Sequence, residues 1–309
     1  MCRSWMDAHM TDKQPGDLPR RDERHSAPNL PRLANLSRRA ALWWDTGTLD
    51  VYGASGGRWG PDPHSALEDW ERFWDWAAGV EPAAGGTPDP VNLGPPVPRP
   101  RQVFAIGLNY RDHAAEAGYV TDGLPQVFTK FPSCLAGPVS SVAAVSSRLD
   151  WEVELVAVIG RTAERVPEER GWDFVAGAMV GQDLSARDVQ LAGESPQWSL
   201  GKSFPGFGPT GPQLVSPYEL ARPDDLEIEC SVNGETVQHS RTSHMIWSLP
   251  QLVARLSSVC TLLPGDLIFT GTPAGVGNRR NPPRYLRPGD RLVSRIGGIG
   301  ELTVDVVEA

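Results

Sequence analysis

The sequence contains few cysteines, and none of them form a close pair. They are scattered over 309 residues without a C-x-x-C spacing: Cys2, Cys134, Cys230 and Cys260. This scatter argues against a structural zinc site and fits a reducing compartment, in which thiols stay free.

Three further features are missing from the chain. No apolar run approaches the length that spans a membrane, and the N-terminus lacks the apolar core of a signal peptide. Basic patches with interleaved aromatic residues are absent, and the net charge is −9. A nucleic-acid partner is therefore not expected. Together these absences predict a cytoplasmic protein that binds neither membrane nor nucleic acid.

Composition divides the chain into three parts. Residues 1–31 are polar and without hydrophobic period, so we expect disorder or an upstream extension. Residues 32–97 are expected to form a small N-terminal domain, with short strands within 33–52 and a helix over 66–78. A capping box from Ser65 to Glu68 is expected to open this helix. A linker rich in Pro and Gly, residues 81–100, leads into the main domain, residues 98–309.

Three acids in two neighbouring segments carry the clearest chemical signal. Residues 150–160 (DWEVELVAVIG) are typical of a strand, because Val and Ile dominate the second half and Gly ends it. Side chains alternate along a strand, so Glu152 and Glu154 point the same way, about 7 Å apart. Asp183 follows the apolar segment 174–180. Three carboxylates without His or Cys suit Mg²⁺ or Mn²⁺, with Ca²⁺ as a third option, rather than zinc.

Each of these residues also has a simpler explanation. Glu152 and Glu154 are equally compatible with a solvated strand edge, and Asp183 is compatible with a helix cap. Arg187, which follows Asp183 in the same segment, is compatible with a surface ion pair.

A short helix is predicted after a strand over 103–106. Asn109 is expected to be its N-cap and Gly118 its C-cap. His113 and Glu116 are three residues apart and share one face of this helix. A carboxylate beside an imidazole orients the ring and raises its basicity, as a base that takes a proton from water requires. An incidental pair on a surface helix is the alternative.

The remaining segments are mostly short strands. Alternation over 226–232 into Asn233-Gly234 predicts a hairpin, residues 248–251 open a helix, and 291–307 read as a second hairpin around Gly297-Gly298. A strand over 267–270 ends in a Gly-rich loop, 271–277, which is neither a Walker motif nor a dinucleotide fingerprint. We expect this loop to bring backbone close to a ligand or metal. Many strands and few helices predict a β-rich α+β fold.

Seven segments taken in order are similar to the fumarylacetoacetate hydrolase family: GLNYRDHAAEAG, PQVFTKFP, LDWEVELVAVIGR, GQDLSARDVQ, GKSFPGFGPTGP, VNGETVQ-SRTS and PGDLIFTGTPAGVG. The resemblance covers the chain from Pro98 to its C-terminus. It implies a mixed β-sandwich roll with a small N-terminal α/β domain, a homodimer, and a divalent metal between protein and substrate.

The resemblance also implies roles for individual residues. The metal ligands would be Glu152, Glu154 and Asp183, and the pair that activates water would be His113 and Glu116. Lys202 would stabilise developing oxyanion charge. The residues near the substrate would be Arg187, Gln190 and Thr272.

Two departures from the family pattern bear on the substrate. Residues 102–109 offer no acid where the tyrosine-catabolic enzyme has a fourth metal carboxylate. This favours the acylpyruvate hydrolase or 2-hydroxyhepta-2,4-diene-1,7-dioate isomerase-like branch. His244 stands where the family usually has Asp, and no physical consequence follows from the sequence.

The resemblance predicts a metal-dependent hydrolase that cleaves a C–C bond in a small anionic 2-oxo or 1,3-dicarbonyl acid. His113 would deprotonate water, Lys202 would stabilise the oxyanion, and the metal would stabilise the departing enolate. The same site would serve oxaloacetate-type decarboxylation or oxo-acid isomerisation, and the sequence leaves these reactions open. A catalytically silent metal-binding assembly protein is the alternative from another class.

Overall fold

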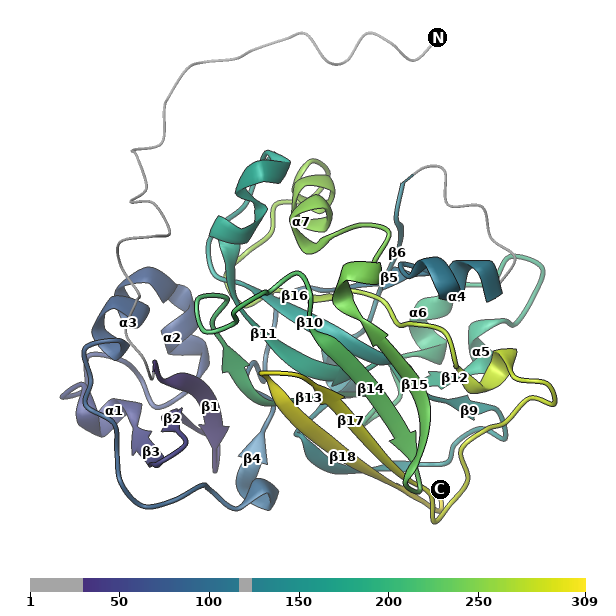
Figure 1. Cartoon of the computed structure of the whole chain (residues 1–309), viewed down its shortest axis with the longest axis horizontal. Coiled ribbons are helices and arrows are strands. Elements are labelled where there is room, and N and C mark those ends of the chain that lie inside the picture. The colour runs from purple at the N-terminus through teal and green to yellow at the C-terminus, as the bar shows by residue number, and fades with distance from the viewer. Residues whose placement is uncertain (1–29, 117–123) are drawn as a thin grey trace, which may run out of the picture.

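The computed structural model describes residues 30–116 and 124–309 (Figure 1). The segment expected to be disordered or an extension lies almost wholly outside the described residues. Gly118, the expected C-cap of the helix that carries His113, also lies outside them.

The largest element is an 11-stranded mixed sheet that runs through the middle of the molecule (Figure 1). Along its path the strands are β3 (Gly47–Asp50), β2 (Arg39–Trp44), β1 (Arg32–Leu36), β13 (Gly208–Val215), β11 (Val175–Gln182), β10 (Val153–Ile159), β16 (Leu267–Phe269), β5 (Val103–Gly107) and β6 (Gln126–Thr129). Two short strands join at the side, β4 (Leu93–Gly94) on β1 and β7 (Leu135–Ala136) on β13.

A second sheet of five strands packs against one face of the first. Its strands, in spatial order, are β15 (Glu235–Arg241), β14 (Glu227–Val232), β17 (Arg291–Ile296), β18 (Gly300–Val307) and β8 (Val139–Ala143). One buried cluster joins Leu155 and Val180 of the first sheet to Ile228 and Leu292 of the second. A two-stranded ladder, β9 (Leu149–Asp150) with β12 (Ser185–Ala186), completes the β structure. The expected β-rich α+β fold is confirmed.

Helices cover the rest of the large sheet on both faces. The aromatic face of α3 (Trp70–Ala77) lies on the face opposite the second sheet, in one cluster with Val156 and Met179. By contrast, α7 (Leu249–Ser257) packs with η3 (Glu168–Phe174) near Ile159, whose side chain points to the same face as that of Leu155. All seven residues of β10 are therefore buried, which explains its continuous apolar composition. The other short helices are α1 (Val51–Ala54), α2 (His64–Glu68), α4 (Arg111–Glu116), α5 (Arg187–Gln190), α6 (Trp198–Gly201), η1 (Pro90–Asn92), η2 (Pro132–Cys134), η4 (Thr242–His244) and η5 (Gly277–Arg279).

Three local expectations are wrong. The single helix over 66–78 is two helices, because the backbone at Asp69 (φ −138°, ψ 63°) leaves the helical region. Ser65 lies inside α2 and donates to the carbonyls of Gly60 and Asp62 instead of capping. Asn109 does not cap α4 through its side chain, whose amide nitrogen donates to Trp247 O and Thr270 O.

Both hairpins are confirmed, and so is the helix expected from residue 248, where Gln251 Oε1 accepts from Ser248 N at 3.0 Å. The N-terminal strands extend the large sheet through the β1–β13 pair, Leu33 opposite Leu214. The domain boundary near residue 97 stays a prediction.

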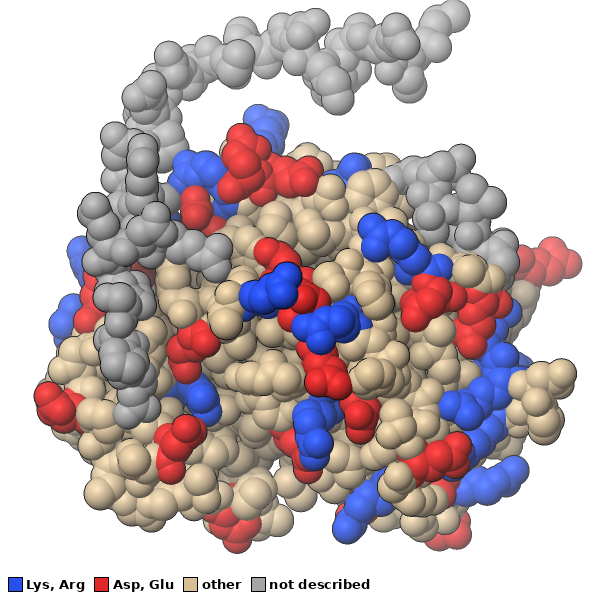
Figure 2. Space-filling model, in the orientation of Figure 1, with Lys and Arg blue, Asp and Glu red and all other residues tan. Residues whose placement is uncertain are grey.

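The face of the molecule in Figure 2 carries arginines and acids side by side. Pairs such as Arg291–Asp305 and Arg295–Glu301, both at 2.6 Å, account for this mixing on the five-stranded sheet. Among the described residues no helix is both long and apolar enough to cross a membrane. The cytoplasmic location stays a prediction.

Candidate metal centre and active site

The three predicted metal ligands converge at one point of the central sheet. Glu152 precedes β10, Glu154 lies within it, and Asp183 follows the adjacent antiparallel strand β11. The two strand ends are joined where Asp183 N donates to Glu152 O at 2.9 Å. One carboxylate oxygen from each residue lies within 4.8 Å of the other two, and all three residues are buried. The convergence expected from strand alternation is therefore present.

Lys202 and Lys130 provide cationic partners for two of these acids. Lys202 Nζ, 1% exposed as a residue, lies 2.6 Å from Glu152 Oε2 and 2.6 Å from Asp183 Oδ2. Lys130 Nζ lies 2.6 Å from Asp183 Oδ1 and also donates to the carbonyls of Lys202 and Phe207. The ammonium of Lys130 thus ties the predicted metal ligand Asp183 to the backbone that carries Lys202.

Arg187 continues this chain of charges on the other side. Its guanidinium lies 2.7 Å from both Asp150 Oδ2 and Glu152 Oε1, and it donates to Gln190 Oε1 at 2.8 Å. The structure thus contains an alternating row of three acids and three bases. In spatial order its members are Asp150, Arg187, Glu152, Lys202, Asp183 and Lys130.

Within residues 30–116 and 124–309, Glu154 is the one carboxylate of the cluster without a cationic hydrogen-bond partner. Its Oε2 accepts from Gly271 N at 2.8 Å. Burial and the neighbouring charges of Asp183 and Glu152 raise the pKa of Glu154 well above its usual range. At Glu152 burial alone would raise the pKa, but the charges of Lys202 and Arg187 lower it to about 2.

This donor set fits a hard divalent cation. All ligand atoms are carboxylate oxygens, which Mg²⁺ and Mn²⁺ prefer. The row of ion pairs is neutral, and Glu154 leaves one negative charge in a buried place, where an uncompensated charge is costly. A cation held by Glu152, Glu154 and Asp183 would compensate that charge.

The cluster opens into a small cavity of about 130 Å³. Glu152, Glu154 and Lys202 line it on the polar side, whereas Phe128 and Trp198, with ring centroids 5.5 Å apart, form an apolar wall. Sites for drug-sized ligands enclose about 300–1,000 Å³. The cavity therefore suits a molecule of a few carbon atoms.

His113 lies on α4 and lines the same cavity, with a residue exposure of 7%. Its Nδ1 is 3.1 Å from Glu116 Oε2. The pairing expected from the i, i+3 spacing is present, and the carboxylate fixes the ring through one nitrogen. Nε2 has no protein partner among the described residues, so it is the ring atom left for proton transfer.

Thr272 also lines the cavity, as expected, but its hydroxyl is already used by the protein. Oγ1 donates to Val153 O at 2.8 Å and accepts from Gln238 Nε2 at 2.8 Å. It secures the Gly-rich loop against β10.

The contacts of Arg187 disfavour the expectation that it binds a carboxylate of the substrate. All three nitrogens of its guanidinium donate to protein oxygens, and Gln190 uses its carbonyl to accept one of these bonds. Both residues line the cavity. Arg187 orients Glu152, whereas the amide nitrogen of Gln190 has no partner among the described residues and stays available as a donor.

Sequence reasoning missed Lys130 and Asp150, although both lie in quoted motifs. A usable signal existed for Lys130. The chain has 26 arginines and only three lysines, Lys13, Lys130 and Lys202. A compact ammonium and a planar guanidinium are not interchangeable, so the two lysines of the main domain mark places that need a point charge. Asp150 carries no such local signal. His244, the other departure, is exposed and contacts Ser240 Oγ at 3.2 Å.

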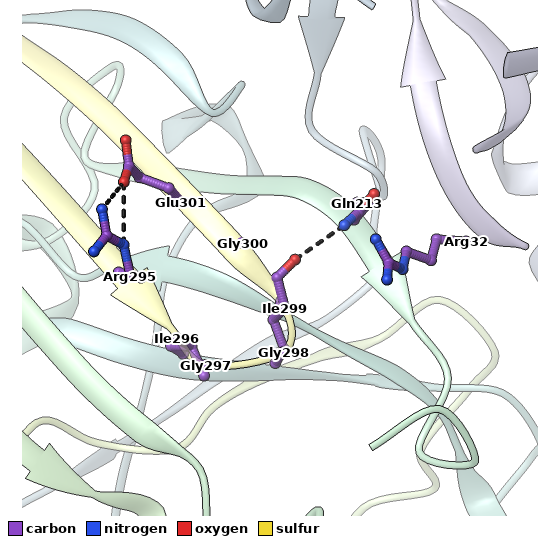
Figure 3. A pocket seen from close by; sticks show the side chains of 9 residues that line it. All are labelled: Arg32, Gln213, Arg295, Ile296, Gly297, Gly298, Ile299, Gly300 and Glu301. Atoms are coloured by element: carbon purple, nitrogen blue, oxygen red, sulfur yellow. Dashed lines mark hydrogen bonds and ion pairs between the residues drawn. The ribbon is translucent and has the colours of Figure 1, made fainter. Parts of the chain in front are cut away.

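A second cavity, of about 390 Å³, lies beside the β17–β18 turn (Figure 3). Its arginines are already paired, Arg32 with Glu219 at 3.1 Å and Arg295 with Glu301 at 2.6 Å. This cavity therefore lacks the unpaired charge and the proton-transfer group that the first cavity contains.

Comparison with known proteins agrees with this geometry. A family model described as fumarylacetoacetate (FAA) hydrolase C-terminal matches residues 102–307. The oxaloacetate tautomerase FAHD2A, mitochondrial, of Homo sapiens is 42% identical over 214 residues, which are 69% of this chain and 68% of that protein. A fumarylacetoacetate hydrolase domain-containing protein 2 homolog of Dictyostelium discoideum is 43% identical over 218 residues, 67% of this chain and 72% of that protein.

Solved structures match over most of the chain. A candidate HpcE protein from Mycobacterium smegmatis has 52% identity and a TM-score of 0.86, covering 90% of this chain and 99% of that one. Maleylpyruvate hydrolase from Sphingobium sp. SYK-6, in complex with manganese(II) and pyruvate, has 27% identity and a TM-score of 0.74, covering 90% and 99%. The resemblance expected from the seven motifs is confirmed, and the chain belongs to the fumarylacetoacetate hydrolase family.

Proposed function

We propose that this protein is a metal-dependent enzyme that moves a proton on a small 2-oxo acid and so interconverts its enol and keto forms. The observation that carries this proposal is one small cavity lined by His113, which Glu116 holds, and by Glu152 and Glu154, which form a triad of metal-type carboxylates with the buried Asp183. The oxaloacetate tautomerases among the relatives support this choice of reaction.

The triad would hold Mg²⁺ or Mn²⁺, with Ca²⁺ as a third option. A divalent ion there would act as a Lewis acid toward the 2-oxo group of the substrate. This lowers the cost of placing negative charge on the oxygen of that group.

His113 is the residue that exchanges the proton. Glu116 holds Nδ1, which leaves Nε2 to take a proton from the carbon next to the 2-oxo group and to deliver a proton to the 2-oxo oxygen, so that the keto form becomes the enol. The reverse transfer restores the keto form. Lys202, buried at the polar wall, stabilises the negative charge that develops on the substrate oxygen. Phe128 and Trp198 exclude water from the opposite side of the cavity.

Hydrolytic C–C cleavage of an acylpyruvate is the second candidate. The same Nε2 would take the proton of a water molecule, and the 2-oxo acid would leave as its enolate. The structural similarity to maleylpyruvate hydrolase favours this alternative. A catalytically silent metal-binding protein is disfavoured, because His113, Glu116 and Lys202 all line or adjoin the cavity with the triad.

The test supplies the purified protein and Mn²⁺ with oxaloacetate, and separately with an acylpyruvate, and follows enol absorbance and pyruvate release together. Tautomerisation removes enol without releasing pyruvate, whereas cleavage or decarboxylation releases it. His113→Ala is expected to lower turnover by about 10²–10⁴-fold, while Mn²⁺ affinity measured by calorimetry stays unchanged. No activity on either substrate, or full activity of the variant, would contradict the proposal.

A further inference from the structure

The cavity of the candidate active site contains an arginine that the described protein leaves unpaired. Arg279, at the end of η5, lines the cavity together with Glu152 and Lys202, and its side chain is exposed. No hydrogen bond or ion pair joins its guanidinium to the residues that the structure describes. Its neighbours differ, because Arg280 donates to Val237 O at 2.9 Å and Arg284 lies 2.8 Å from Glu235.

The turn that carries Arg279 is anchored to the ion-pair row. Asp150, whose other partner is Arg187, accepts from Gly277 N at 2.7 Å and from Asn278 N at 2.9 Å. A Cβ on Gly277 would lie 1.9 Å from Arg284 O, so this close approach requires glycine. The backbone of η5 therefore has a defined position relative to the metal-type carboxylates.

Asn278 presents a second donor beside Arg279. Its Oδ1 accepts from Arg148 Nη2 at 3.0 Å and from Tyr285 Oη at 2.8 Å. The side-chain oxygen is thus occupied, whereas the amide nitrogen has no acceptor in the described part of the chain and remains available to donate. Asn278 also lines the cavity.

The charges of the site indicate what these donors meet. The four acids of the cluster exceed its three bases by one negative charge, and a divalent ion would turn this into one positive charge. That charge matches the single carboxylate of a 2-oxo acid. Arg187 is committed to protein acids. Among the described residues that line this cavity, Arg279 is therefore the free cation that a second carboxylate can meet.

We propose that Arg279, with Asn278 beside it, is the specificity-determining residue that pairs with the far carboxylate of a dicarboxylic 2-oxo acid. A guanidinium matches a carboxylate with two parallel hydrogen bonds, which favours this end group over an apolar one. The inference rests on the proposed function, because the near end of the ligand must bind at the triad.

The test uses two ligands of equal length that differ only at the far end, 2-oxoglutarate and 2-oxopentanoate. Calorimetry on the Mn²⁺-loaded protein gives the ratio of their dissociation constants. Arg279→Met should weaken the binding of 2-oxoglutarate about five- to twentyfold. This loss lies between the effect of an exposed ion pair and that of a charge-assisted hydrogen bond. The same substitution should leave the dissociation constant of 2-oxopentanoate unchanged. Arg279→Lys should restore part of the ratio between the two dissociation constants. In the wild type, added salt should reduce the ratio.

Arg287→Met is the matched control, because Arg287 is exposed in the same segment and does not line the cavity. It should bind both ligands as the wild type does. Equal weakening of both ligands by Arg279→Met, or none, overturns the role of Arg279 and leaves the proposed function standing. Failure of the wild type to bind 2-oxopentanoate with Mn²⁺ overturns both.

Discussion

Lysine is the scarcest charged side chain in this protein, and both lysines of the main domain lie in one buried cluster. Lys130 is 1% exposed, and its ammonium contacts Asp183 and two backbone carbonyls. Burial alone would lower the pKa of Lys130, but the charge of Asp183 raises it, so the side chain stays protonated. Lys130 is thus a structural cation that holds a metal-type ligand.

Lys130→Met should therefore destabilise the protein strongly. Asp183 Oδ1 would lose its ammonium partner in a place without solvent, and removal of one member of a buried pair costs about 3–5 kcal/mol. Urea unfolding measures this change. Arg291→Met serves as the control, since it breaks an exposed pair and should cost about 1 kcal/mol or less. Equal losses of unfolding free energy in the two variants would show that the buried contact of Lys130 contributes no more than an exposed ion pair.

Glu219 gives the protein a pH dependence away from the active site. Burial raises the pKa of Glu219 to about 7 although Arg32 opposes the shift, and its Oε1 is buried without a partner. Between the ordinary value of 4.5 and about 7 the folded state binds the proton that the unfolded state has released. Stability therefore falls as pH rises through this window and stays lower above it.

Glu219→Gln should remove this dependence. Relative to wild type, the variant should gain on the order of 1–2 kcal/mol in unfolding free energy between pH 4.5 and pH 8. Urea unfolding at both pH values measures the difference, with Glu301→Gln on the exposed Arg295 pair as the comparison. A gain that does not change with pH would contradict a raised pKa at Glu219.

At the scale of elements, the spacing of side chains along the chain predicts strands and helices. It does not predict which distant segments contact one another. Strand alternation alone places Glu152 and Glu154 on one side. One of the two cationic partners of Asp183, by contrast, is Lys130, 53 residues earlier in the chain, and no local pattern encodes that contact. The family resemblance implies a place near the substrate for Arg187, whereas in the fold Asp150 and Glu152 bind its guanidinium.

The same limit applies to helices. The helical spacing of apolar residues over 66–78 continues on both sides of Asp69. This spacing alone predicts one helix, whereas the backbone forms two. Asn109 has the residue type of an N-cap, but tertiary contacts with Trp247 and Thr270 use its side chain.

The turn η5 offers a test of how tightly an element is coupled to the site. A methyl group on Gly277 would lie 2.7 Å from Asp150 Oδ1 as well as against Arg284 O, so the turn must move. Gly277→Ala should cost about 1–3 kcal/mol of stability, as overpacking does, and should weaken ligands that reach Arg279. Thermal unfolding and calorimetry measure the two effects. Gly297→Ala is the control, because its methyl group would meet nothing closer than 3.7 Å, and it should behave as wild type.

At the scale of the whole molecule, the β6 edge of the large sheet carries exposed apolar side chains. No described strand pairs with the outer side of β6. β6 ends the strand order, and Val127, Phe131 and Leu200 nearby are 43%, 48% and 66% exposed. Phe131 N donates to Ser203 Oγ at 3.0 Å, and α6 contacts β6. We call the surface that Val127, Phe131 and Leu200 form here the edge patch. Exposed sheet edges and apolar patches are uncommon in monomers.

We expect the edge patch to be covered in the homodimer that the family resemblance implies. A carboxylate at its centre would be desolvated on association, so Leu200→Glu should raise the dimer dissociation constant at least about tenfold. Sedimentation velocity over a concentration series measures this shift. Val259→Glu is the matched control, because Val259 is 84% exposed at the end of α7, outside the edge patch. A wild type that sediments as a monomer would refute the dimer, and a Leu200→Glu variant as dimeric as the control would place the interface elsewhere.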